Sequence, residues 1–280
     1  MKGPTMIRHI AAATALLLIP CALAQTPAAR PPSSRPPALR PSFDAFEVAT
    51  VKLVDHDPKG GRYFRMQDAH RWVAKDYTLP LLIAAAYDLN TRTISGGPDW
   101  IDSAHFDIVA ITPGDVQPNR IEQMAMLRKL LTDQFQLTFH RQSREFSLYE
   151  LQVAKGGPRL KESTAPADEA PKLITTVYPP AKLVLPARNA TMQDFVFMLQ
   201  RAMLDRPVTD KTGLTARYDF DLTWAPDETQ FGGEVPVASA DAPSPPLFTA
   251  LQQQLGLKLV AARGPINALV IDHAVQPSSN

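Results

Sequence analysis

The sequence predicts an α+β protein built from two tandem, related modules of helices and small sheets. Apolar residues recur at helical spacing in several segments. Other segments alternate apolar and polar residues, as half-buried strands do. The order of these segments in the first half of the chain recurs in the second half. We therefore expect duplicated strand–helix–strand–helix–hairpin units.

The first module is predicted over residues 43–160. Thr78 is a plausible N-cap of a helix, because Leu79, Leu82 and Ile83 then share one apolar face. A Gly-Gly-Pro turn at 96–98 precedes a strand that alternates from His105. The predicted elements are, in order, strands at 46–51, 62–66 and 71–75, the helix after Thr78, a strand at 105–111, a helix at 119–133, and a closing hairpin with strands at 135–139 and 149–153.

The second module is predicted over residues 188–276, after a linker at 161–187 that is rich in Pro, Ala, Asp and Glu. Thr191 and Asp194 have the spacing of a capping box at the start of a helix. A strand at 218–222, a Pro-rich loop at 226–246, a helix at 247–254 and strands at 255–259 and 269–271 follow.

The internal repeat is visible when Leu127–Val153 is laid without a gap on Leu247–His273. Apolar positions coincide, and Phe106-Asp107 falls on Tyr218-Asp219. The identical residues in the long alignment are Leu127, Leu131, Gln134 and Leu137. Asp99, Asp102 and His105 fall on Lys211, Leu214 and Arg217. The features that the two segments share are therefore those that folding requires, and the ionisable residues Asp99, Asp102 and His105 are not among them.

The N-terminus has the features of a secretory signal peptide at residues 1–24, with Lys2 and Arg8 before a short apolar run and Ala22-Leu23-Ala24 at its end. Residues 25–42 form a Pro-rich tether. We expect an exported protein, periplasmic or extracellular, with no membrane span after signal cleavage. Cleavage would remove Cys21, the only cysteine, and with it thiol chemistry.

The charge balance gives no reason to expect a nucleic-acid partner. Lys and Arg number 29 against 28 Asp and Glu, so the formal net charge is +1. Nucleic-acid binding generally needs a basic excess on one face. We expect no nucleic acid among the partners.

Four motifs together resemble one family. They are Ile94–Asp102 (ISGGPDWID), Arg128–Leu137 (RKLLTDQFQL), Ala154–Pro158 (AKGGP) and Asp210–Phe220 (DKTGLTARYDF). The chain resembles the exported, soil-associated bacterial proteins grouped as domain of unknown function 3738, common in acidobacteria. Ala216 stands where that family suggests glycine, and the resemblance implies no established activity.

Each half is also weakly similar to the short N-terminal domain of secretins and TonB-dependent receptors. Thr78-Leu79 before a helix and Leu130-Leu131 leading into a hairpin carry this similarity. It implies binding to other envelope proteins.

No hydrolase, metalloprotease or phosphate-loop motif occurs in the sequence. The candidate catalytic residues are Asp99, Asp102, His105 and Asp107, which put three carboxylates and an imidazole in one short segment. The folding explanation is simpler, because Asp99 and Asp102 suit turns and Asp107 suits the open side of a strand.

The sequence predicts no cofactor and no metal site. His56, His70, His140 and His273 are dispersed, and no two of them have the spacing of paired metal ligands.

We expect a non-catalytic protein that binds an unidentified partner protein in the cell envelope, through an exposed sheet edge. A secreted hydrolase or glycan-active enzyme using the Asp/His cluster is one alternative. A small-ligand or carbohydrate binding module with Trp100 in its cleft is the other.

Overall fold

The computed structural model describes the chain over residues 41–57, 61–166, 168–173, 176–178, 182–233, 237–238 and 243–278. The predicted signal peptide and nearly all of the predicted tether lie outside these residues. Among the residues described, no helix is long and apolar enough to cross a bilayer.

The first sheet has four antiparallel strands in the order β1-β5-β3-β2. Even-numbered residues of β5 (Phe106, Ile108 and Ala110) are buried, and odd-numbered residues lie on the more open face. The strands are β1 Val48–Val54, β2 Tyr63–Met66, β3 Arg71–Tyr77 and β5 His105–Ile111. The sequence predicts a strand in each of these four segments.

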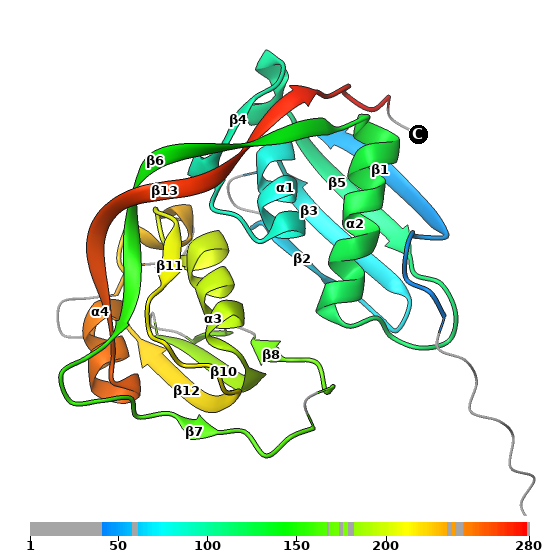
Figure 1. Cartoon of the computed structure of the whole chain (residues 1–280). Coiled ribbons are helices and arrows are strands. Elements are labelled where there is room, and N and C mark those ends of the chain that lie inside the picture. Colours follow the sequence, from blue (N-terminus) through cyan, green and yellow to red (C-terminus); the bar gives the residue numbers. More distant parts are fainter. Residues whose placement is uncertain are drawn as a thin grey trace, which may run out of the picture. The chain divides into compact units, whose positions relative to one another are not determined.

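Two helices, α1 (Leu79–Tyr87) and α2 (Arg120–Phe135), cover one face of this sheet (Figure 1). Thr78 is the N-cap of α1 as predicted, although its side chain makes no capping hydrogen bond. Trp72, Phe106 and Phe135 are fully buried in the core between the sheet and the helices.

The second sheet has the order β7-β12-β10-β8, with β9 also paired to β10. Its strands are β7 Lys161–Glu162, β8 Lys172–Leu173, β9 Thr176–Tyr178, β10 Lys182–Ala190 and β12 Tyr218–Trp224. Most of β10 lies where the sequence predicts a linker. Pro186 explains the difference, because proline inside a segment argues against a central strand.

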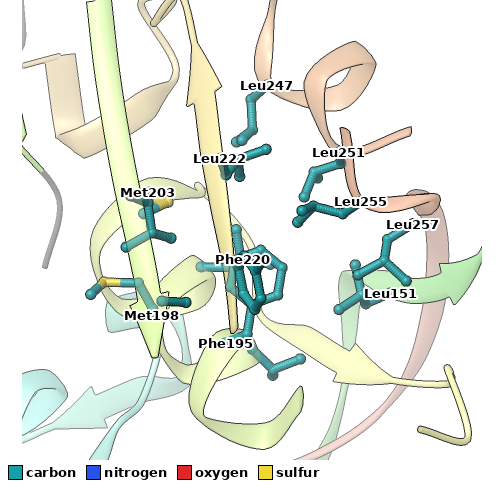
Figure 2. Packing of buried hydrophobic residues seen from close by; sticks show 14 of the residues in the cluster. Leu151, Phe195, Met198, Met203, Phe220, Leu222, Leu247, Leu251, Leu255 and Leu257 are labelled. Carbon is teal, nitrogen blue, oxygen red and sulfur yellow. The ribbon is translucent and has the colours of Figure 1, made fainter. Parts of the chain in front are cut away.

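The helices of the second half each end in a π-helical turn. They are α3 Met192–Met198 followed by η3 Leu199–Met203, and α4 Leu247–Ala250 followed by η5 Leu251–Leu255. The predicted capping box of Thr191 and Asp194 is confirmed. Figure 2 shows how Phe195, Phe220 and Leu222 pack with leucines of α4 and η5 in the second core.

Two long strands, β6 (Thr138–Val153) and β13 (Leu257–His273), run antiparallel to each other along their whole length (Figure 1). The predicted hairpins at 135–153 and 255–271 are therefore wrong. Residues 140–147 are mostly polar, as in a turn. They remain extended because the opposite strand pairs with every one of them, and a two-stranded ribbon can expose polar side chains on both faces.

Each long strand contributes to both cores. Leu151 of β6 and Leu257 of β13 are buried in the second core, whereas Leu269 of β13 is buried in the first and Phe139 of β6 packs against it. Two short parallel strands complete this sheet, in the order β11-β6-β13-β4, with β4 Ile94–Gly96 and β11 Val208–Asp210.

The short helical turns are η1 Thr91–Thr93, η2 Asp99–Asp102 and η4 Gln230–Gly233. The α+β class is confirmed.

Candidate metal centre

Three elements of the first half meet at the end of the first sheet where β5 begins. The last residue of β1, Val54, pairs with His105, and His56 follows two residues later. On the other side of β5, Tyr77 pairs with Phe106 after an irregularity in β3 that contains Asp76. The strand pairing therefore brings His56, Asp76 and His105 together.

The side chains of these three residues converge. His56 Nδ1 lies 2.9 Å from one carboxylate oxygen of Asp76, and His105 Nδ1 lies 2.8 Å from the other. One ligand atom from each residue lies within 4.8 Å of the other two. The imidazole rings of His56 and His105 are stacked, with centroids 4.5 Å apart.

The contact between His105 and Asp76 is close but is not a hydrogen bond. Asp76 Oδ1 and His105 Nδ1 are both buried, and neither has a hydrogen-bond partner within the part of the chain described. The Asp76 side chain is 8% exposed and that of His105 is 18% exposed. Two buried polar atoms that lie 2.8 Å apart need either a proton or a cation between them.

The backbone of Asp76 holds its carboxylate in place. Asp76 has φ 61°, in the left-handed region that Asp and Asn tolerate better than most residues. Its backbone N–H donates to a carboxylate oxygen of Asp107 at 2.9 Å. Asp107 therefore positions a potential ligand without offering one itself.

The second half builds the same local backbone with different side chains. Asn189 has φ 52°, and its backbone N–H donates to Asp219 at 2.9 Å. Its side-chain amide donates to the carbonyl oxygens of Pro166 and Glu169, and Arg217 occupies the position of His105 before the paired aromatic residue. Arg217 is itself a cation and has no acceptor atom, so the second half lacks the donor set of two imidazoles and one carboxylate.

The candidate residues from the sequence divide into two groups. His105 belongs to the cluster and offers one of its three potential ligand atoms, and Asp107 accepts the backbone N–H of Asp76 beside it. Asp99 and Asp102 are exposed in η2 and do not belong to the cluster. The predicted Asp/His grouping therefore forms only in part.

Trp100 is half-buried and packs edge-on against Phe106, with ring centroids 6.1 Å apart. It contacts the core through this face.

Sequence reasoning missed His56 and Asp76, and it predicted no metal site. These residues are separated from each other and from His105 by long stretches of chain, so no spacing motif joins them. The one available signal was strand register: a correct pairing of β1 and β3 with β5 places all three at one sheet end. His140, by contrast, forms a two-residue exposed pair with Asp272, at 2.7 Å.

Comparison with family profiles gives one assignment. The family described as "Protein of unknown function (DUF3738)" matches residues 80–274, which is most of the chain. The chain belongs to the DUF3738 family. Comparisons with curated proteins and with solved structures find no match. His105 lies within the segment that DUF3738 matches, and His56 and Asp76 lie before it.

Two imidazoles and one carboxylate form a donor set suited to divalent transition metals, Zn²⁺ in particular. Structural zinc sites usually have four protein ligands, whereas three protein ligands leave a coordination position open. The ring of His56 is half-exposed, so the cluster is open to solvent at this residue.

Proposed function

We propose that this DUF3738 protein is an exported, non-catalytic binding protein that holds one divalent transition-metal ion at His56, Asp76 and His105. Zn²⁺ is the ion that fits the donor set best. The observation that carries the proposal is the convergence of three ligand atoms, two of them buried without a hydrogen-bond partner in the described part of the chain.

An alternative role for the cluster is neutralisation of the buried Asp76 carboxylate by two protonated imidazoles. This role would favour a linear hydrogen bond from each ring. His56 forms a hydrogen bond with the carboxylate at 2.9 Å, whereas His105 does not, because its Nδ1 is close to the carboxylate without hydrogen-bond geometry. A metal ion shared by the three atoms accounts for both contacts.

The proposal predicts a stoichiometry of one ion per chain. The corresponding position in the second half has Asn189 and Arg217 instead of Asp76 and His105. The shared backbone geometry also supports the proposal that the two halves arose by duplication. In both halves, the residue two positions before the N-cap of a helix has a left-handed backbone conformation. This residue donates its backbone N–H to the side chain of an aspartate.

Export is part of the proposal and rests on the sequence of residues 1–24. The absence of a motif for catalysis supports binding as the activity.

Isothermal titration calorimetry with Zn²⁺ tests the proposal. The purified chain, first stripped with a chelator, should bind one equivalent of Zn²⁺. His105→Ala should weaken binding by more than about tenfold, since even residues that only orient metal ligands are worth that much. His140→Ala is the matched control, because it removes an imidazole from an exposed pair that offers only two ligands.

The metal site would be contradicted if the chain did not bind Zn²⁺. It would also be contradicted if His140→Ala weakened binding as much as His105→Ala does. Circular dichroism of each variant shows whether the fold is intact.

One surface favours a second candidate function, the binding of an envelope protein by strand addition. β1 is at the edge of the first sheet, among the strands described. Val48 is 63% exposed beside its cross-strand neighbour Ile111. An apolar, unpaired strand edge is a template for a further strand.

Val48→Lys places a charge on this edge and tests strand addition. The variant should lose any specific partner that the wild-type chain recovers from envelope proteins. Leu53→Lys, at a position of β1 on the opposite face, serves as the comparison. Equal recovery by wild type and Val48→Lys would contradict strand addition at this edge.

A further inference from the structure

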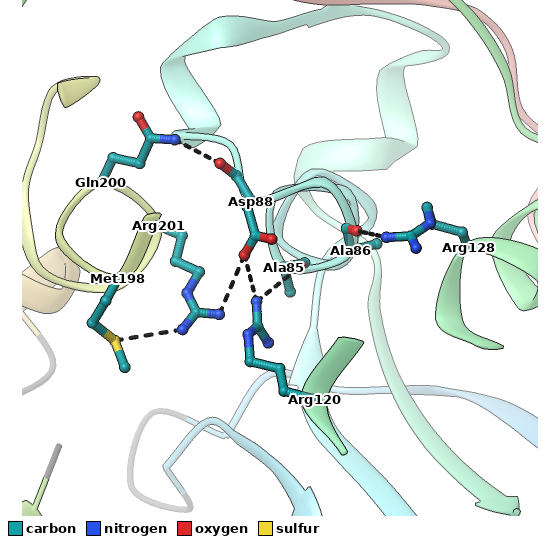
Figure 3. Close-up of polar contacts among 8 residues, drawn as sticks. All are labelled: Ala85, Ala86, Asp88, Arg120, Arg128, Met198, Gln200 and Arg201. Carbon is teal, nitrogen blue, oxygen red and sulfur yellow. Dashed lines mark hydrogen bonds and ion pairs between the residues drawn. The ribbon is translucent and has the colours of Figure 1, made fainter. Parts of the chain in front are cut away.

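A second cluster of charged residues lies at the C-terminal end of α1, away from the ligands of the candidate metal centre. Asp88 is the C-cap of α1, with φ 53°. Its carboxylate accepts a hydrogen bond from the guanidinium group of Arg120 in α2. The guanidinium group of Arg201 in η3 lies 3.5 Å from the same carboxylate oxygen (Figure 3). One carboxylate therefore faces guanidinium groups from both halves of the fold.

Arg120 and Arg128 are held by the last carbonyl groups of α1. Arg120 donates to Ala85 O at 3.3 Å, and Arg128 donates to Ala86 O at 2.6 Å (Figure 3). Cations near the C-terminal carbonyls of a helix are favourable. These contacts keep both guanidinium groups at the end of α1.

Arg201 has much poorer contacts. Its side chain is only 11% exposed, and its two described hydrogen bonds are 3.5 Å long, to Asp88 and to Met198 Sδ. Its Nε is buried without a partner in the described part of the chain. Burial, with the nearby positive charge of Arg120, lowers the pKa of Arg201 to about 9. Arg201 is thus a buried cation whose hydrogen bonds are long and leave its Nε without a partner among the described residues.

A pocket of about 210 Å³ opens onto this cluster. Its charged lining consists of three arginines and two aspartates, Asp88 and Asp194, which leaves one positive charge in excess. Its apolar lining consists of Ile121, Met124, Ala170, Pro171, Leu173 and Phe197. Ile121 is 64% exposed, so solvent reaches the apolar lining at this residue.

We propose that this pocket binds a short-chain carboxylic acid, with the carboxylate against Arg201 and Arg120 and the hydrocarbon chain against Ile121, Met124 and Phe197. A planar guanidinium pairs with a carboxylate through two parallel hydrogen bonds, which would supply the partners that Arg201 lacks. A single excess positive charge suits a monoanion, and the apolar wall suits an aliphatic chain rather than an inorganic ion.

Titration of the purified chain with hexanoate, followed by protein NMR, tests the proposal. Hexanoate should shift the resonances of Arg120, Arg201 and Ile121 with saturation. Hexanamide has the same chain without the charge and should bind at least tenfold more weakly. Inorganic phosphate has the charge without the chain and should also bind at least tenfold more weakly.

Arg201→Gln should weaken hexanoate binding at least tenfold, whereas Arg65→Gln, an exposed arginine stacked on Tyr63, should leave it unchanged. Since Arg201 is buried and its loss could unfold the chain, Ile121→Glu gives a second test at an exposed position. Ile121→Glu should abolish hexanoate binding by charge repulsion, and Ile121→Gln should retain it.

Equal binding of hexanoate and hexanamide, or of hexanoate and phosphate, would overturn the proposal. So would resonance shifts confined to residues outside the pocket, and so would unchanged affinity in Ile121→Glu. Each of these results is independent of Zn²⁺ binding at His56, Asp76 and His105.

Discussion

Asp107 accepts the backbone N–H of Asp76 at 2.9 Å, and this hydrogen bond fixes the left-handed residue that carries the buried carboxylate. Because the bond positions a ligand, its loss should reduce metal affinity. We expect Asp107→Ala to weaken Zn²⁺ binding by about 10–100-fold, as measured by calorimetry.

Asp219→Ala removes the equivalent bond to Asn189 in the second half and is the matched control. It should destabilise the fold to a similar extent without changing the affinity for Zn²⁺. Equal loss of affinity in both variants would show that the effect is one of general stability.

Asp219 should also make stability depend on pH. The N–H of Asn189, followed by the hydroxyl of Ser163, lowers the pKa of Asp219 below its usual value. A lowered pKa in the folded state contributes stability above the unfolded pKa, and this contribution is lost as the pH falls through the folded value. In urea titrations, Asp219→Asn should be less stable than wild type at neutral pH, and the difference should shrink in strong acid. A difference that stays constant down to the acid limit would argue against this bond.

The capping box of α3 should contribute measurably to stability. Thr191 Oγ1 accepts the backbone N–H of Asp194, and the Asp194 carboxylate accepts the backbone N–H of Thr191. Thr191→Ala should lower the free energy of unfolding by about 1 kcal/mol, and Thr191→Ser should cost less, because Ser retains the acceptor. Chemical denaturation measures both, and equal costs for the two variants would contradict the role of the hydroxyl.

Gly256 should not accept any side chain. It has φ +65°, and a Cβ at this position would lie 2.0 Å from the carbonyl oxygen of Gly157. Gly213 has φ +70° but nothing within 4 Å of its Cβ position. Gly213→Ala should lower the free energy of unfolding by about 1–2 kcal/mol, because alanine is strained in this backbone conformation. Gly256→Ala should lower it clearly more, because the added Cβ also clashes, and the same denaturation experiment measures both. Equal costs would mean that the loop of Gly157 can move aside.

The local elements of this protein could be predicted from its sequence, because short-range physics decides them. The apolar alternation of β5, the capping pair of Thr191 and Asp194 and the helix that contains Leu127 all follow from neighbouring residues. The two long strands could not be predicted. Their polar middle is typical of a turn, and only pairing between residues far apart in sequence keeps it extended.

The candidate site shows the same limit more sharply. The sequence indicates His105 and Asp107 as candidates because other ionisable residues lie close to them in the chain. It indicates Asp99 and Asp102 for the same reason, but these two residues lie in an exposed turn. His56 and Asp76 have no local signal, because their proximity to His105 depends on the register of three strands.

X-ray absorption spectroscopy at the zinc K-edge, on the chain loaded with one equivalent of Zn²⁺, tests the metal centre most directly. We predict a first shell that contains two imidazoles and a carboxylate, and the loss of one imidazole in His56→Ala. A first shell without imidazole, or one that His56→Ala leaves unchanged, would contradict the assignment of His56, Asp76 and His105 as the ligands.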